Sequence, residues 1–313
     1  MKEIKITKEY NIFGKTVPVK NYMCSKNGCP YVEKCEPVQI QLSISPTSFC
    51  TGSCPFCVAA KNKSDKGFLD VKKLETVLVE LQKMNIVRGI SITGGEPFTD
   101  VLLLNEIIEM VFDIFGLEIQ MSINTNGIGL KELDKIKRYL FIDTIHISRH
   151  HYDDERNSKY FGMTVPTEEE LTEIVGREKD KRLFVFNCLL LKDGIGTKEE
   201  MKRFLEFSNR VGVPKVGFVT VMDINPYTKK NRISYTELID RSDPDFLFTD
   251  HYDDFDICKC QDGIFVTKQG RLTEFYGRET GYGTVEYARG LVYSADNKLK
   301  LGYGDNAEVL LEL

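Results

Sequence analysis

Residues 39–58 read Gln-Ile-Gln-Leu-Ser-Ile-Ser-Pro-Thr-Ser-Phe-Cys-Thr-Gly-Ser-Cys-Pro-Phe-Cys-Val. A β-branched run at the start of this stretch predicts a strand, and the loop after it carries Cys50, Cys54 and Cys57. The spacing Cys-x3-Cys-x2-Cys delivers three thiolates to one point from a single short loop. Three thiolates suit three irons of a [4Fe–4S] cube, and an open coordination position is where a metal centre does chemistry. We therefore expect Cys50, Cys54 and Cys57 to hold such a cluster.

A zinc site and disulfide bonds both fit the three cysteines less well than a cluster does. A structural zinc site usually takes four ligands from two Cys-x2-Cys pairs, whereas this loop supplies three. Disulfides are disfavoured because the chain has nine cysteines, an odd number, and no apolar signal segment opens it. A reduced cytoplasm is the expected compartment.

The composition sets limits on the class of protein. A chain of 313 residues with 42% hydrophobic content can bury a large core. No apolar run is long enough to cross a bilayer, so we expect a soluble protein without membrane partners. The net charge of −5, with both signs interspersed, argues against a broad nucleic-acid-binding surface.

The middle of the chain alternates strand-like and helix-like segments, which predicts repeated βα units around a parallel sheet. The predicted strands are Gln39–Ser45, Arg88–Thr93, Glu118–Asn124, Asp143–Ser148, Arg182–Leu191 and Lys215–Met222. Capping boxes at Thr167 and Thr197 predict two helix starts, and Gly212 predicts a helix end. Six βα units predict an α/β fold, a partial (β/α)6 TIM-type barrel, with the active site at the carboxyl ends of the strands.

The two flanks of the barrel differ from it in pattern. Residues 1–37 predict a small hairpin, turning near Phe13 and Gly14, followed by a cysteine-containing arm. Residues 38–224 form the predicted barrel, and residues 225–313 form a predicted β-rich extension. We expect three regions with these boundaries.

Further motifs follow the predicted strands in order: Thr93-Gly94-Gly95-Glu96-Pro97, then Ser122-Ile-Asn-Thr-Asn-Gly127, then polar residues on later strands. With the cysteine loop, this series resembles the radical S-adenosylmethionine (SAM) superfamily. The resemblance implies that SAM binds the open iron and is held by residues of these motifs. The implied SAM-binding residues are Phe56, Gly94, Gly95, Glu96, Pro97, Asn124, Thr125, Ser148, Asn187 and Met222. Glycine is expected at 94 and 95 because backbone there approaches the ligand closely.

Residues 38–224 are most similar to the GTP 3′,8-cyclase family of molybdenum-cofactor biosynthesis. The sequence departs from that family where basic residues bind the triphosphate, since Ser43, Ser91 and Val185 stand there. The family's second cysteine set and its glycine–arginine tail are also missing. Losing three cations would remove most charge-assisted bonds of an anion site, which implies a different substrate.

A second set of cysteines precedes the barrel. Cys24, Cys29 and Cys35 have the spacing Cys-x4-Cys-x5-Cys, which lipoyl synthase uses for an auxiliary cluster, and Cys258 and Cys260 offer a fourth ligand. We expect an auxiliary iron–sulfur cluster that joins the N-terminal arm to the extension. A zinc site and unligated thiols stay open as alternatives.

Three of the four histidines fall in His146-Ile-Ser-Arg-His-His151, at the end of a predicted strand. One interpretation makes Arg149, His150, His151 and Tyr152 catalytic, by contacting substrate, moving a proton or, for Tyr152, supplying a hydrogen atom. The alternative is a loop that hydrogen-bonds to itself and organises the barrel rim. The sequence favours the catalytic interpretation because catalytic groups concentrate at strand ends.

The resemblance implies a reaction type. A flavodoxin- or ferredoxin-type reductant reduces the cluster, SAM is cleaved to methionine and a 5′-deoxyadenosyl radical, and the radical abstracts hydrogen from a substrate. We expect a small, nucleotide- or sugar-like substrate. The alternatives are a peptide-modifying maturase and, outside enzymes, a catalytically silent iron–sulfur or zinc protein on the same scaffold.

Overall fold

The computed structural model describes residues 4–23, 40–58, 67–178, 180–240, 242–250, 263–267, 272–276, 290–303 and 307–313. Its strands are β1 (Ile4–Ile12), β2 (Lys15–Met23), β3 (Ile40–Ile44), β4 (Val87–Ile92), β5 (Gln120–Thr125), β6 (Thr144–Ser148), β7 (Phe184–Leu190), β8 (Lys215–Thr220), β9 (Phe246–Asp250), β10 (Gly263–Thr267), β11 (Leu272–Tyr276), β12 (Gly290–Tyr293), β13 (Lys298–Lys300) and β14 (Val309–Glu312). Its α-helices are α1 (Val71–Lys83), α2 (Val101–Phe115), α3 (Asp154–Phe161), α4 (Glu168–Arg177), α5 (Lys198–Val211) and α6 (Pro226–Asn231).

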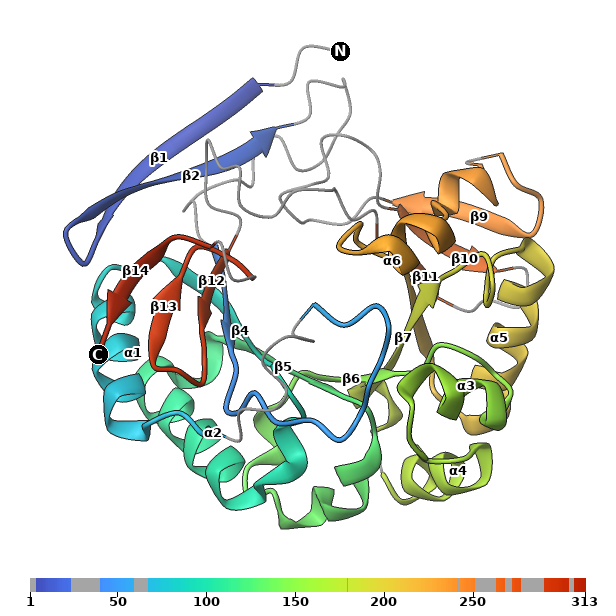
Figure 1. Cartoon of the computed structure of the whole chain (residues 1–313), viewed down its shortest axis with the longest axis horizontal. Helices are drawn as coiled ribbons and strands as arrows, with labels where there is room; N and C mark the ends of the chain where they lie inside the picture. The colour runs from blue at the N-terminus through green and yellow to red at the C-terminus, as the bar shows by residue number, and fades with distance from the viewer. Residues whose placement is uncertain are drawn as a thin grey trace.

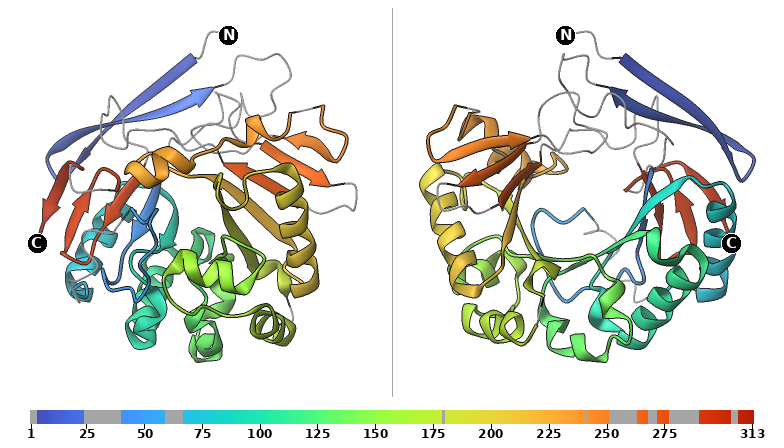
Figure 2. Two further views of the ribbon diagram at one scale, coloured as in Figure 1. Left: turned by 45° about the vertical axis from the view of Figure 1, so that its right-hand side comes forward. Right: turned by 180° about the vertical axis from the view of Figure 1, so that it is seen from behind.

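One curved sheet of 12 strands organises the molecule, in the order β14-β13-β12-β3-β4-β5-β6-β7-β8-β11-β10-β9. The strands from β3 to β8 pair in parallel in chain order. Most helices lie on the outer side of this sheet, and the sheet stays open between its two edges (Figures 1 and 2). This arrangement confirms the predicted α/β partial TIM-type barrel.

The six predicted barrel strands all form, with ends that shift by a few residues. The largest shifts at a strand start are in β5, which begins at Gln120 rather than Glu118, and in β7, which begins at Phe184 rather than Arg182. In both, a 3₁₀ turn occupies the residues just before the strand, Gly116–Glu118 and Lys181–Leu183. Pattern alone locates a buried strand but leaves its ends open, since end residues are also suited to turns.

The predicted helix boundaries are confirmed by their caps. The Thr167 hydroxyl accepts a hydrogen bond from the Glu170 amide at the start of α4, and Thr197 does the same for Glu200 at the start of α5. Gly212 ends α5 in the left-handed region with φ of 86°. Both caps satisfy amides that the first turn of a helix leaves unpaired.

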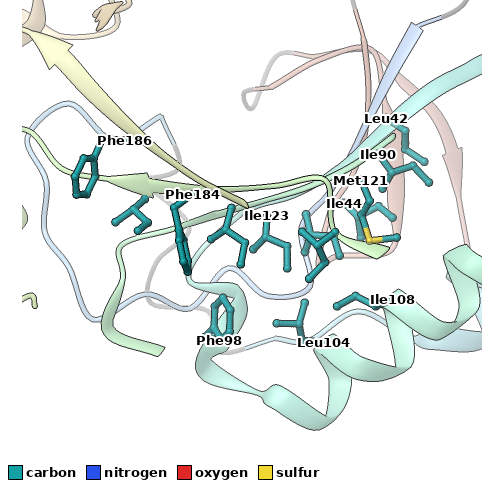
Figure 3. Close-up of a cluster of buried hydrophobic side chains, with 14 of the residues drawn as sticks. Leu42, Ile44, Ile90, Phe98, Leu104, Ile108, Met121, Ile123, Phe184 and Phe186 are labelled. Carbon is teal, nitrogen blue, oxygen red and sulfur yellow. The ribbon is translucent and has the colours of Figure 1, made fainter. Parts of the chain in front are cut away.

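Alternate residues of the barrel strands build the core between sheet and helices. Leu42, Ile44, Ile90, Met121 and Ile123 lie close to Leu104 and Ile108 of α2 (Figure 3). Because side chains alternate across a strand, the residues between them face the inner side of the curved sheet. Those intervening positions carry polar groups, which makes the inner face chemically different from the outer one.

The N-terminal hairpin and the C-terminal strands attach to the barrel. Phe13 and Gly14, both with positive φ, form the predicted two-residue turn between β1 and β2. The Lys15 ammonium donates to the Val309 carbonyl of β14 at 2.5 Å. The extension adds strands at both sheet edges, since β12 pairs in parallel with β3 and β11 pairs in parallel with β8. The predicted boundaries of the three regions stay a prediction.

Within the described part of the chain, no helix has both the length and the apolar character that crossing a membrane requires.

The packing of β11 against the barrel gives a stability prediction. Phe275 is fully buried, stacks on Phe218 at 5.4 Å between ring centroids and contacts Tyr235 and Phe246. We expect Phe275→Ala to lower the free energy of unfolding by about 3–5 kcal/mol, because it leaves a cavity among aromatic rings. Leu102→Ala, at a side chain that is 82% exposed, is the control and should change it by less than about 0.5 kcal/mol. Equal effects in denaturant unfolding would show that β11 is not part of the barrel core.

Candidate functional site

The cysteine loop leaves the carboxyl end of β3. Cys50, Cys54 and Cys57 are half-buried and form no disulfide with any described residue. The Gly52 amide donates to the Cys50 sulfur at 3.4 Å, and the Cys57 amide donates to the Cys54 carbonyl at 3.2 Å. A compact loop with an amide aimed at a sulfur suits thiolate ligands, since such bonds stabilise the charged form.

The fit of these residues to an iron–sulfur cluster rests on the chemistry of the donors. Three cysteines on one partly exposed loop are the soft ligands that such clusters take. Among the described residues, no three His, Cys, Asp or Glu side chains are grouped closely enough to hold a metal ion. The structure therefore places the three thiols on one loop without gathering them around a point.

The segment after β4 docks directly on the cysteine loop. The Gly95 amide donates to the Thr47 carbonyl at 2.8 Å, and the Glu96 amide donates to the Phe49 carbonyl at 2.9 Å. A Cβ atom at Gly95 would lie 2.0 Å from the Phe49 carbonyl oxygen, which is impossible without moving the loop. The glycine is therefore required for contact with the cysteine loop, a reason that differs from the expected approach to a ligand.

The Glu96 carboxylate joins this segment to the end of β5. It accepts hydrogen bonds from the Thr125 hydroxyl at 2.7 Å and the Asn126 amide at 2.8 Å, and its Oε1 also accepts the Phe98 amide at 3.2 Å. Burial raises the pKa of Glu96, while these donors oppose the rise. The side chain thus fixes the mutual position of two motifs predicted for SAM binding. Pro97 is buried at the first position of the 3₁₀ turn that follows.

The inner face of the sheet is lined by neutral polar groups. Ser43, Ser91, Ser122 and Thr144 lie in one register row across β3, β4, β5 and β6. Asn124 lies two residues after Ser122 on β5, and its side-chain amide donates to the Ser91 hydroxyl at 2.8 Å.

Two further predicted SAM contacts lie beside each other on the same face. Ser148 and Asn187 are register partners on β6 and β7. Among the residues that the structure describes, the buried Asn187 side-chain oxygen has no hydrogen-bond partner, so it is available to a ligand. Met222 follows β8 by two residues and is half-buried.

Arg149 lies on the other side of the strand, among the helices. It is 1% exposed, and its guanidinium donates to the His151, Pro166 and Tyr152 carbonyls and pairs with Asp154. It also lies 4.8 Å above the Phe207 ring. These contacts use the Nε, Nη1 and Nη2 donors of the guanidinium, so the geometry gives Arg149 a role in holding the loop after β6.

The two histidines of this loop are also buried. The His150 Nδ1 accepts the Leu189 amide at 3.2 Å, and its ring meets Phe56 edge-on at 4.8 Å and stacks on Phe161 at 5.1 Å. Burial lowers the pKa of His150 to about 3 and that of His151 to about 4, so both rings are neutral. The Tyr152 hydroxyl accepts from Arg203 at 3.5 Å. The catalytic roles predicted for these four residues stay a prediction, and the contacts favour the alternative of a self-organised rim.

The end of α3 contacts the cysteine loop at Ser53, which the sequence did not predict. The Ser53 amide donates to the Phe161 carbonyl at 2.7 Å. Gly162 has φ of +64°, and a Cβ atom there would lie 1.9 Å from the Ser53 hydroxyl. The stretch between Cys50 and Cys54 is therefore held in place by the end of the helix that follows the histidine loop.

Asp193 follows β7 and accepts hydrogen bonds from residues of both α3 and α6. The sequence did not predict this contact either. The Tyr160 hydroxyl donates to the Asp193 carbonyl at 2.8 Å, and the Tyr227 hydroxyl donates to its carboxylate at 3.1 Å. Burial raises the pKa of Tyr160 to about 12, which keeps this donor protonated. The Asn225 side chain donates to the Pro55 carbonyl at 2.8 Å, between two of the cysteines. These residues lack a motif, and only their convergence in space reveals them.

The second cysteine set lies outside the described residues. This applies to Cys24, Cys29, Cys35, Cys258 and Cys260. The auxiliary cluster stays a prediction.

Comparison with known proteins gives one family match. The sequence profile described as "Radical SAM superfamily" matches residues 44–226. This range includes the cysteine loop and all six barrel strands except the first residues of β3.

Three known proteins show similarity of different extent. GTP 3′,8-cyclase of Aquifex aeolicus is 25% identical over 66% of this chain and 65% of its own length. The putative peptide biosynthesis protein YydG of Bacillus subtilis is 28% identical over 31% of the chain and 30% of its own length. The crystal structure of Streptococcus suis SuiB bound to precursor peptide SuiA matches with a TM-score of 0.53 at 16% identity, over 86% of the chain and 62% of SuiB, which shows a shared fold. The chain thus spans less than two thirds of each relative's length.

The docking of Gly95 gives a prediction for cluster binding. We expect Gly95→Ala to lose most of the iron bound after anaerobic reconstitution and to destabilise the protein by about 1–3 kcal/mol, because the new methyl displaces the cysteine loop. Gly176→Ala is the matched control, since nothing lies within 4 Å of a Cβ atom at that helical position. It should keep wild-type iron and equal or exceed wild-type stability. Full iron content in Gly95→Ala would contradict the proposed contact.

The burial of His150 predicts a pH dependence of stability. Its pKa is about 3 in the folded protein against 6.5 for a free histidine, so the unfolded chain binds a proton that the folded protein does not. Stability should therefore fall as pH drops below 6.5, by up to about 1.4 kcal/mol per pH unit from this residue. In chemical unfolding between pH 6 and pH 4, His150→Asn should show a shallower loss by that amount. Identical slopes would mean that His150 is solvated.

Proposed function

The chain belongs to the radical SAM superfamily, and from this premise we propose that it is an enzyme that cleaves SAM reductively and removes hydrogen from a small substrate. The observation that carries the proposal is the joint placement of the cysteine loop and the Gly94–Glu96 segment. They leave the carboxyl ends of adjacent strands β3 and β4 and are joined by backbone hydrogen bonds. Active sites of barrels of this type lie at that end of the strands.

Each group of residues has a proposed task. Cys50, Cys54 and Cys57 would hold a [4Fe–4S] cluster, which supplies the electron that splits SAM. Gly94 and Gly95 offer backbone groups beside the cluster loop. Orientation of SAM is assigned to Ser148, Asn187 and Met222, and Phe56 offers an aromatic face to the adenine. The unpartnered Asn187 oxygen supports this assignment.

The remaining inner face would bind the substrate. Hydroxyl groups from Ser43, Ser91 and Ser122 can donate and accept hydrogen bonds. Lys215 is paired with Glu274 at 2.5 Å, so this cation is neutralised. Such a lining suits a nucleoside- or sugar-like group better than a triphosphate. The protein's contribution would be to hold the reacting C–H bond near SAM and exclude other hydrogen donors.

A peptide substrate is the second candidate. YydG is described as a putative peptide biosynthesis protein, and SuiB was crystallised with a precursor peptide. Both similarities support the peptide-modifying alternative. At this level of identity they indicate a shared fold and do not identify the substrate. The non-enzymatic alternative, a silent iron–sulfur or zinc protein, is disfavoured because the residues assigned to SAM are present together. A cytoplasmic location, with a flavodoxin- or ferredoxin-type reductant, is part of the proposal.

SAM cleavage tests the proposal directly. After anaerobic reconstitution and reduction with dithionite, the protein should form 5′-deoxyadenosine and methionine from SAM, while Cys54→Ala should not. The same preparation gives the iron content, with about four irons per chain for one cluster and about eight if the auxiliary cluster forms. Equal 5′-deoxyadenosine from both proteins would refute the enzymatic proposal. Stimulation by nucleosides or sugars, rather than by peptides, would distinguish the two substrate classes.

A further inference from the structure

The cysteine loop is held at a third point, besides its contacts with the segment after β4 and with the end of α3. The Asn225 side-chain amide donates to the Pro55 carbonyl at 2.8 Å. Pro55 directly follows Cys54 and lies in the turn that the Cys57 amide closes by donating to the Cys54 carbonyl at 3.2 Å. The main chain is therefore fixed on both sides of Cys54, at Ser53 by α3 and at Pro55 by Asn225.

Asn225 is also the cap of α6. Its side-chain oxygen accepts the Thr228 amide at 2.9 Å, and its own backbone amide donates to the Thr228 hydroxyl at 3.0 Å. A backbone amide only donates and a carbonyl only accepts, so the orientation of the Asn225 side chain is fixed at both ends. Aspartate and serine are equally good helix caps, but aspartate has no donor for Pro55 and the serine side chain ends one atom earlier. Asparagine is thus required for the contact with Pro55 and not for the helix.

Helix α6 gives this cap residue a fixed base. The Tyr227 hydroxyl donates to the Asp193 carboxylate at 3.1 Å, and the Asn231 carbonyl at the end of the helix accepts the Lys192 amide at 2.8 Å. The Tyr227 side chain also packs against the buried cluster of side chains that Cys54 contacts. Both ends of α6 are therefore joined to the loop after β7, and the helix can carry an anchor for the cysteine loop.

The segment between β8 and α6 also carries Met222, which lies three residues before Asn225. We propose that Asn225 is a positioning residue that orients the Cys54–Cys57 turn through the Pro55 carbonyl. The turn and the segment with Met222 are thereby joined. The inference rests on the proposed function, in which the cysteines hold the cluster and Met222 faces SAM. Groups behind a metal ligand fix its orientation, so loss of this anchor weakens both iron retention and SAM binding.

Hydrogen exchange of the protein without iron tests the anchor by itself. The variants are Asn225→Asp and Asn225→Ser, which both keep the helix cap. We expect the peptide covering residues 50–58 to exchange about two- to tenfold faster than in the wild type, because one hydrogen bond of the turn is lost. Exchange in α6 should stay at the wild-type rate, because the cap remains.

Iron release and SAM affinity test the consequence in the reconstituted protein. Both variants should release iron to a chelator about two- to tenfold faster than the wild type, and the Kd of SAM in calorimetry should rise in the same range. The serine variant adds no charge, so an effect shared by both variants comes from the lost donor.

Asn11→Asp is the matched control. The Asn11 side-chain oxygen accepts the Gly14 amide at 2.9 Å in the hairpin of β1 and β2, and an aspartate keeps this bond while adding the same charge. This variant should show wild-type exchange in residues 50–58, wild-type iron release and wild-type SAM affinity.

Four results would overturn the role assigned to Asn225. They are wild-type exchange of residues 50–58 in both variants, equal acceleration in α6 and in the loop, an effect confined to Asn225→Asp, and wild-type iron release and SAM affinity despite faster exchange. A wild-type protein that forms no 5′-deoxyadenosine from SAM would instead refute the proposed function. Hydrogen exchange of the iron-free protein would still decide whether Asn225 anchors the loop.

Discussion

Two backbone hydrogen bonds between the Gly95–Glu96 amides and the Thr47 and Phe49 carbonyls are the constraint on which the site depends. They fix the cysteine loop to the adjacent strand by main-chain atoms, so the contact does not depend on side-chain rotamers. The absence of a Cβ atom at Gly95 allows this approach. The Glu96 carboxylate then extends the connection to β5 through Thr125 and Asn126. Three successive strand ends thereby become one unit.

A buried arginine stabilises the opposite side of the loop. Removing Arg149 from water is costly, and burial lowers its pKa, but three carbonyls and Asp154 replace the lost hydration. This network orders the turn into α3, whose last residues hold Ser53. A charge placed deep in the structure thus serves to orient the loop that carries the three cysteines.

The inner and outer faces of the sheet have separate functions. The outer face is sealed by apolar side chains against the helices (Figure 3), which supplies most of the hydrophobic stabilisation. The inner face keeps hydroxyl and amide groups in register rows. Because the C-terminal strands extend both sheet edges without joining them, the described strands leave the barrel open. Openness and a polar lining are the properties that substrate binding inside a barrel requires.

The sequence by itself determined the barrel, its six central strands, the caps at Thr167 and Thr197, and the family. These features depend on local pattern, on short-range hydrogen bonds and on motifs contiguous in the chain. Tertiary structure decided the rest. Pattern placed the histidine loop at the barrel mouth, but only packing showed that Arg149 turns outward and that His150 lies against Phe56. Asp193, Tyr160, Tyr227 and Asn225 come from three separate elements and carry no motif. Their role arises from distances between segments far apart in sequence, and periodicity along one chain holds no information about such distances.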